Sequence, residues 1–171
     1  MINESISDLP KRKQLRLHAY DYASCGAYFV TICAYQREHL FADVLVGQGL
    51  CPCRLTAIGS IVQSEIENIK TRFAHVGVDK YIVMPNHVHL ILRIGEHRQG
   101  QSPCPTVGDM IGAMKSISTK RANAMDLSGD RKIWQFRYHD HIIHNEQEYL
   151  KIADYIDTNP LTWAQDCFYA P

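Results

Sequence analysis

Four segments of the chain have the residue pattern of strands, and three others have the apolar spacing of amphipathic helices. The strand segments, which are rich in β-branched and aliphatic residues, are 27–34, 76–83, 87–94 and 133–143. In the helical segments apolar residues recur at helical spacing, and these segments are 57–73, 106–118 and 146–158. The predicted order is therefore strand, helix, strand, strand, helix, strand, helix.

This order predicts an α+β fold. Its first six elements fit a ferredoxin-like (RRM-like) antiparallel sheet with two helices on one face. The seventh element is a helix that Pro160 stops, and this helix can cover the other face of the sheet. Pro85 and Asn86 predict the turn between the second and third strands, and residues 46–50 predict the turn of a short hairpin. Residues 95–105 are rich in Gly, Gln, Ser and Pro and predict a mobile loop.

Composition indicates a single globular domain. The chain has 171 residues, of which 46% are hydrophobic and 21% are charged. We expect residues 1–15 to form a flexible tail and residues 16–171 to form one domain. Formal net charge is zero with neutral histidines, so only a local basic patch at residues 11–16 suggests nucleic acid. Of the six cysteines, Cys51 and Cys53 are separated by a single residue and the other four are scattered. We see no signal-peptide core, and we expect all six to be free thiols in a cytoplasmic protein.

Two histidines stand at alternate positions of the third predicted strand. Successive strand side chains point to opposite faces, so one face carries His87, His89, Ile91 and Arg93. Two imidazoles this close can bind one metal ion together, and apart from Arg93 the rest of the strand is apolar. The pair therefore favours a metal site. The alternative is a pair of exposed histidines on a half-buried sheet.

The last predicted helix carries a tyrosine beside its apolar stripe. The stripe, which a helix packed on a sheet requires, comprises Tyr149, Ile152, Ala153 and Ile156. Tyr155 lies beside the stripe, and Asn159 follows four residues later on the same side of the helix. A phenol and an amide on one flank can reach a shared point on the sheet. Periodicity alone favours a packing tyrosine with a solvated hydroxyl.

Both motifs resemble those of a known enzyme family. His87-Val88-His89 resembles the HUH motif (histidine, hydrophobic residue, histidine) of single-tyrosine transposases. Tyr155-Ile156-x-x-Asn159-Pro160-Leu161 resembles the tyrosine helix of their REP-associated group, the RAYTs. Further blocks are similar to that group in the same order, from about Arg16 to Trp163: Arg16-Leu17, Tyr20-Asp21-Tyr22, Gly26-x-Tyr28-Phe29-Val30-Thr31-Ile32-Cys33, Lys115-Ser116 and Trp134-Gln135-x-Arg137-Tyr138-x-Asp140-His141-x-Ile143.

The resemblance implies a nuclease and strand-transfer enzyme that acts on single-stranded DNA, often next to a REP-like hairpin, as a monomer or a homodimer. Tyr155 would be the nucleophile, forming a 5′-phosphotyrosine link and freeing a 3′-hydroxyl. His87 and His89 would hold a divalent cation, Mg²⁺ or Mn²⁺, with Asn159 in the place of a third ligand. This donor set has no carboxylate, which would leave the ion its full charge as a Lewis acid.

Seven further residues are candidates for DNA contact: Lys11, Arg12, Lys13, Arg16, Arg93, Lys115 and His141. The first four form the basic patch near the start of the chain, and Arg93 shares the histidine face. Lys115 lies on the basic outer side of the second predicted helix. His141 belongs to a polar cluster, completed by His139, Asp140 and His144, that fits the polar rim of an exposed sheet equally well.

Two other functions fit parts of the pattern. A histidine-triad nucleotide hydrolase also has alternating histidines on a strand, but its third histidine would fall on Ile91. A non-catalytic module of ferredoxin-like fold binds single strands by stacking bases on exposed aromatic residues, and the histidine face offers no such pair. A metal titration followed by a gel for covalent protein–DNA adducts separates the three functions.

Overall fold

The structure is a computed structural model that describes residues 25–44, 53–95, 105–129 and 131–169. Its strands are β1 (Gly26–Cys33), β2 (Ala42–Val44), β3 (Cys53–Leu55), β4 (Val76–Val83), β5 (His87–Ile94) and β6 (His139–Ile143). Its helices are α1 (Ala57–Glu67), α2 (Ile69–Arg72), α3 (Val107–Ala124) and α4 (Glu146–Thr158), with the 3₁₀ helices η1 (Tyr35–Arg37) and η2 (Asn159–Gln165). The predicted tail, the turn at residues 46–50 and most of the loop at 95–105 lie outside the described residues.

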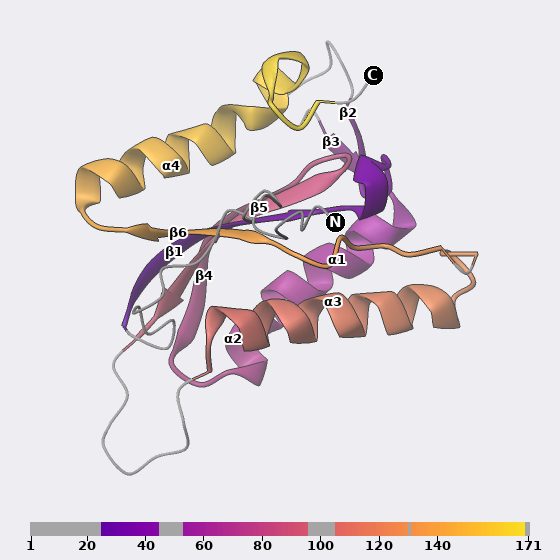
Figure 1. Cartoon of the computed structure of the whole chain (residues 1–171), viewed down its shortest axis with the longest axis horizontal. Coiled ribbons are helices and arrows are strands. Elements are labelled where there is room, and N and C mark those ends of the chain that lie inside the picture. Colours follow the sequence, from indigo (N-terminus) through magenta and orange to yellow (C-terminus); the bar gives the residue numbers. More distant parts are fainter. Residues whose placement is uncertain (1–24, 45–52, 96–104, 130, 170–171) are drawn as a thin grey trace, which may run out of the picture.

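Four strands form one antiparallel sheet in the order β4-β5-β1-β6. Helices α1, α2 and α3 lie on one face of this sheet, and α4 lies on the other (Figure 1). The small strands β2 and β3 pair with each other, as the predicted hairpin requires. The α+β, ferredoxin-like arrangement is therefore confirmed, including a last helix on the second face of the sheet.

The main hydrophobic core lies between the sheet and helices α1 and α3. The core-facing residues of β5, all almost fully buried, are Val88, Leu90, Leu92 and Ile94. Burial of side chains of this size stabilises the fold by about 1.5–3 kcal/mol each. A slip of β5 by one residue would exchange these side chains for the two histidines, so the core holds the register that places His87 and His89 on the opposite face.

A smaller apolar cluster holds α4 against the histidine face. Ile91 of β5 packs with Ala153 and Ile156 of α4, and the partly buried Phe29 and Tyr149 pack against them. The stripe predicted from helical spacing therefore makes the contact with the sheet, and the flank beside it faces β5.

Side-chain caps set the start of the two longest helices. Thr106 accepts a hydrogen bond from the Asp109 backbone N–H, and the Asp109 carboxylate accepts one from the Thr106 backbone N–H. Asn145 accepts a hydrogen bond from the backbone N–H of Glu148 at 2.9 Å. The helix predicted at residues 146–158 consequently has those bounds.

Two predicted elements are divided or shortened. The helix at residues 57–73 is interrupted at Asn68 and forms α1 and α2. The strand at residues 133–143 is regular only in β6, because the ammonium of Lys115 donates hydrogen bonds to the carbonyl oxygens that flank Phe136, at 2.8 and 3.1 Å. The alternation predicted for this strand fails at the same place, where Phe136 is 97% exposed. Within the described part of the chain, no helix is both long and apolar enough to cross a membrane.

Candidate metal and tyrosine site

The two histidines at the start of β5 are buried under the segment that contains α4 and η2. His87 and His89 are 0% and 1% exposed, and their ring centroids are 4.4 Å apart. They are therefore not the exposed pair that the sequence left as an alternative. Burial lowers the pKa of His87 to about 4, and burial together with the neighbouring His87 lowers the pKa of His89 to about 3. Both rings are neutral at neutral pH, the state in which imidazole binds a metal ion.

Asn86 fixes the tautomer of His87. Its amide nitrogen donates a hydrogen bond to the Phe168 carbonyl oxygen at 2.9 Å, so its amide oxygen is the atom that lies 2.9 Å from His87 Nδ1. An amide oxygen only accepts, and the proton of the neutral ring must therefore be on Nδ1. The lone pair of His87 is left on Nε2, which is buried and has no hydrogen-bond partner among the described residues.

His89 is held between a hydroxyl on the neighbouring strand and a hydroxyl on α4. Thr31 Oγ1 lies 2.8 Å from His89 Nδ1, and Tyr155 Oη lies 3.2 Å from His89 Nε2. Phe29 stacks on the other side of the ring, with centroids 5.2 Å apart. The position and orientation of His89 are therefore determined by three contacts, two from β1 and one from α4.

Tyr155 reaches the histidines from the flank of α4. Its side chain is only partly covered, at 37% exposure, and its hydroxyl donates a hydrogen bond to Asp166 Oδ2 at 3.0 Å. Burial and the negative charge of Asp166 raise the pKa of Tyr155 above its ordinary value. The hydroxyl is consequently protonated at neutral pH, and it lies between an imidazole and a carboxylate.

Asp166 is the component of the site that the sequence did not predict. It follows η2, and its Oδ1 accepts a hydrogen bond from the Phe168 backbone N–H at 2.6 Å. Burial acts against its ionisation, but this N–H and the side chains of Asn159 and Tyr155 hold its pKa below the ordinary value. A carboxylate therefore stands beside the histidines, a donor that the set predicted from the sequence did not include. Asp166 belongs to no periodic pattern that could have signalled it.

Asn159 lies where the helix spacing predicts, with its side chain fully buried. Its amide nitrogen donates a hydrogen bond to Asp166 Oδ2, and its amide oxygen has no hydrogen-bond partner within the described residues. Asn159 therefore orients the carboxylate and also presents a free oxygen lone pair inside the site.

Aromatic rings close the site above the histidines. The ring centroid of Phe168 lies 4.7 Å from that of His87 and 5.7 Å from that of His89, and Trp163 lies 5.8 Å from His87. The guanidinium of Arg37 sits over Phe168, 4.9 Å from its centroid. These rings exclude water from the imidazoles, which is the physical cause of the low histidine pKa values.

The residues present fit a divalent cation. One ligand atom from each of His87, His89 and Asp166 lies within 4.8 Å of the other two. His87 Nε2 and Asn159 Oδ1 are buried lone-pair atoms without a partner in the described chain, although buried polar atoms are normally satisfied. An ion held by two nitrogen donors and one or two oxygen donors would satisfy both atoms.

The predicted DNA-contact residues are dispersed, and three of them contact other groups of the protein. Arg93 pairs with Asp79, and His141 Nε2 lies 2.6 Å from Glu148 Oε1. Lys115 is turned toward the backbone carbonyls before β6, and residues 11–16 lie outside the described part of the chain. DNA contact at all of these positions stays a prediction.

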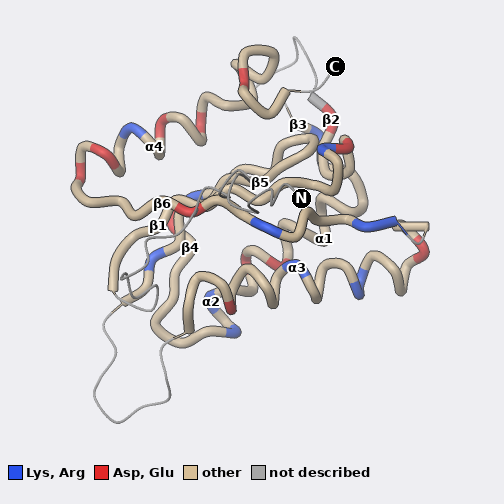
Figure 2. Tube along the Cα trace, in the orientation of Figure 1, with Lys and Arg blue, Asp and Glu red and all other residues tan. Residues whose placement is uncertain are grey.

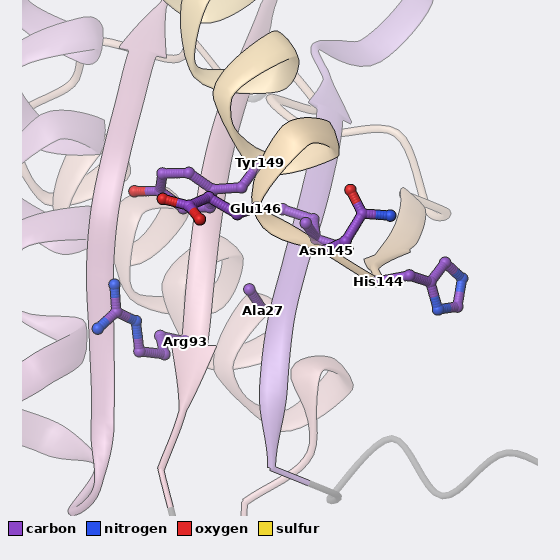
Figure 3. A pocket seen from close by; sticks show the side chains of 7 residues that line it. Ala27, Arg93, His144, Asn145, Glu146 and Tyr149 are labelled. Carbon is purple, nitrogen blue, oxygen red and sulfur yellow. The ribbon is translucent and has the colours of Figure 1, made fainter.

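A shallow pocket lies at the N-terminal end of α4, away from His87 and His89. It has a volume of about 350 Å³ and is lined by Ala27, Arg93, Ile143, His144, Asn145, Glu146 and Tyr149. Arg93 and Tyr149 lie on one side of it, and His144 and Asn145 lie on the other (Figure 3). None of the converging residues His87, His89 and Tyr155 lines this pocket. The candidate site is therefore the histidine and tyrosine cluster.

Comparison with known proteins places the chain in a family. No family model matches it. An uncharacterised protein from Haemophilus influenzae is 34% identical over 173 residues, which cover 92% of this chain and 93% of that protein. The chain belongs to the family of this protein.

Two solved structures resemble the fold. One is a REP-associated tyrosine transposase bound to a REP hairpin, with 22% identity, a TM-score of 0.54, and coverage of 88% of this chain and 76% of the other. The chain has the fold of this transposase. The other is a crystal structure of a candidate transposase from Deinococcus radiodurans, with 20% identity, a TM-score of 0.48, and coverage of 84% of this chain and 95% of that chain. The expectation of a RAYT-like fold is confirmed by the first of these two structures.

Proposed function

We propose that this protein is a metal-dependent nuclease and strand transferase of the single-tyrosine HUH class, acting on single-stranded DNA beside a hairpin. The observation that carries the proposal is the place of the Tyr155 hydroxyl, 3.2 Å from His89 Nε2 and 3.0 Å from Asp166 Oδ2. A nucleophile, neutral imidazoles and a carboxylate meet at one partly buried point, an arrangement suited to metal-assisted attack on a phosphodiester. The fold shared with a REP-associated tyrosine transposase supports the proposal.

The proposed reaction is a phosphoryl transfer to Tyr155. A bond forms between Tyr155 Oη and phosphorus, and the bond from phosphorus to the 3′ oxygen breaks. The phenol proton moves toward Asp166, which already accepts the O–H, and the departing 3′ oxygen takes a proton from water. The products are a 5′-phosphotyrosine and a free 3′-hydroxyl. Attack on this link by another 3′-hydroxyl reverses the chemistry and joins a new strand.

A bound divalent cation would supply positive charge that offsets the negative charge of the phosphate in the transition state. His87, His89 and Asp166 would hold the ion, with Asn159 as a further donor. Imidazole ligands suit Mn²⁺ better than Mg²⁺, and the carboxylate suits either ion. The raised pKa of Tyr155 means that the phenol needs this charge and the contact with Asp166 to react at neutral pH.

The substrate and the working unit are part of the same proposal. The transposase of similar fold is bound to a REP hairpin, and we propose single-stranded DNA with a hairpin as the substrate of this chain too. We also propose that residues 16–171 act as one catalytic domain in the cytoplasm, as a monomer or a homodimer.

The proposal is tested by incubating the purified full chain with labelled, hairpin-bearing single-stranded DNA and either Mg²⁺ or Mn²⁺. The expected result is a cleaved strand together with a protein–DNA species that survives denaturation. Binding without cleavage in both metals would contradict the nuclease and favour the non-catalytic binding module.

Asn159→Ala is expected to raise the Mn²⁺ concentration for half-maximal cleavage by less than about tenfold, because Asn159 is one donor among several and also orients Asp166. The measurement is a metal titration of the cleavage rate. Thr158→Ala, which removes a hydroxyl bonded to the Asp154 carbonyl on the same helix end, is the matched control and should leave the titration unchanged. An unchanged titration for Asn159→Ala would show that the amide does not serve the metal.

Asn86→Ala is expected to weaken Mn²⁺ binding by about 10- to 100-fold, because the group that holds the proton on His87 Nδ1 is lost. Calorimetric titration of the DNA-free protein with Mn²⁺ measures this directly. Asn86→Asp keeps an acceptor for the Nδ1 proton but loses the amide donor to Phe168, and it should retain most of the affinity. Equal loss in both variants would show that Asn86 acts through the Phe168 contact and not through the tautomer.

A further inference from the structure

The segment that leads into β6 exposes an aromatic side chain on a fixed piece of backbone. Phe136 is 97% exposed, the most exposed of the large apolar side chains in the described chain, which also include Met125 at 61% and Leu161 at 74%. Lys115 holds the backbone beneath it through hydrogen bonds to the carbonyl oxygens on both sides. Because the backbone holds this ring in water, the fold does not gain the free energy that its burial would supply. A single exposed apolar residue is common in proteins and does not by itself indicate a binding site. The charges of the neighbouring residues therefore decide whether Phe136 is a candidate binding residue.

The surroundings of Phe136 are basic. Arg131, Lys132 and Arg137 are exposed on the same short segment. Arg131 lies 3.9 Å from the Glu38 carboxylate, and Arg137 makes no ion pair with any described residue. The Lys132 ammonium lies 5.4 Å from the centroid of the Tyr35 ring. Figure 2 shows the positive stretches of this segment, and it shows that α4 on the other side of the sheet carries several acidic positions. A polyanion is therefore favoured along this segment and disfavoured along the outer surface of α4.

The segment also borders the candidate site. The backbone N–H of Gln135 donates a hydrogen bond to the carbonyl of Cys33 at 3.0 Å, and Cys33 pairs with His87 in the sheet register. Phe136 is thus attached two strand positions away from His87, at the edge of the sheet, with β1 between them. Two strand spacings amount to about 10 Å. A short single strand with one phosphate at Tyr155 can extend over this edge.

We propose that Phe136 is a stacking platform for a base of the single-stranded DNA that flanks the cleaved phosphate, with Arg137 and Lys132 beside it as phosphate contacts. The inference rests on the proposed function, and it adds a contact for the DNA outside the histidine and tyrosine motifs. Base stacking on an aromatic side chain is independent of sequence, since every base has a flat face, and basic neighbours bind the backbone.

The test is binding of a fluorescein-labelled oligothymidine of about 12 nucleotides to the full chain, followed by anisotropy in the presence of a chelator so that no cleavage occurs. Phe136→Ala should weaken binding roughly 5- to 100-fold, and Phe136→Trp should restore it. Met125→Ala, a truncation of another exposed apolar side chain, should have no effect. Arg137→Gln should lower the slope of log affinity against log salt by about one.

An oligomer of the same length with abasic positions separates stacking from other effects. Phe136→Ala should bind this oligomer as wild type does, because no base is present to stack. Wild-type affinity of Phe136→Ala for oligothymidine, or an equal loss on both oligomers, would overturn the platform. So would a change in the sedimentation of Phe136→Ala, which would make the ring a contact between copies of the chain. If a result that overturns the platform is found together with normal adduct formation, the proposed function stands without the platform. If the wild-type protein binds no single-stranded DNA, the platform and the proposed function both fail.

Discussion

Tyr155→Phe is expected to form no covalent adduct with hairpin-bearing single-stranded DNA, and its cleavage rate should fall by at least about 1000-fold. Phenylalanine retains the ring and its edge contact with Phe29, whose centroid is 6.2 Å away, and removes only the hydroxyl. The side chain is 37% exposed, so the variant should keep wild-type stability and DNA affinity. Denaturing gels of labelled DNA with each variant measure the adduct.

Tyr149→Phe is the matched control on the same helix. Tyr149 is partly buried against the Ile91 cluster, as its place in the apolar stripe predicted, and its hydroxyl lies 3.5 Å from Asp79. This variant should keep the adduct. An adduct at the wild-type level with Tyr155→Phe would show that the nucleophile has been assigned wrongly.

His87→Ala and His89→Ala are each expected to reduce cleavage at limiting metal by about 100-fold or more and to weaken Mn²⁺ binding to the free protein. Each substitution removes one of the two nitrogen donors, and the other imidazole together with the oxygen donors holds the ion more weakly. DNA affinity should stay close to that of wild type, because neither buried ring is accessible to a nucleic acid. Cleavage rates and calorimetric Mn²⁺ titrations measure the two effects separately.

Stability must be followed in the same variants, since the rings are buried. Loss of His87 leaves Asn86 Oδ1 without its donor, and loss of His89 leaves Thr31 Oγ1 without its partner. We expect the free energy of unfolding to fall by about 1–3 kcal/mol in each variant. Urea unfolding identifies this loss. A folded His89→Ala protein with a wild-type cleavage rate at limiting metal would contradict the metal site.

The fold could be predicted from the sequence because its signals are local and periodic. The strand of His87 and His89 alternates between a histidine face and an aliphatic face, and the core enforces that alternation. Helix α4 has an N-cap at Asn145 and a proline after its last turn, so both of its ends were predictable. The meeting of Tyr155 with the histidines followed from placing this helix on the second face of the sheet.

Asp166 was not predictable because it belongs to no periodic pattern of residues. It is one of 18 acidic residues, and it follows a short 3₁₀ helix whose path depends on Trp163 packing near His87. The edge segment at residues 133–138 was misassigned for a related reason. The carbonyl oxygens of Gln135 and Arg137 accept hydrogen bonds from the side chain of Lys115, a tertiary contact that outweighs strand propensity.

The central claim is most directly tested by locating the covalent bond between protein and DNA. Trypsin cleaves after Lys151, so Tyr149 and Tyr155 fall in different peptides. The full chain is incubated with hairpin-bearing single-stranded DNA and Mn²⁺, digested with nuclease and trypsin, and analysed by fragmentation mass spectrometry. We predict a 5′-phosphate-linked nucleotide on the peptide that begins at Ile152, with fragment ions placing it on Tyr155 and not on Tyr169. A nucleotide on any other residue, or efficient cleavage with no modified peptide, would contradict the proposed mechanism.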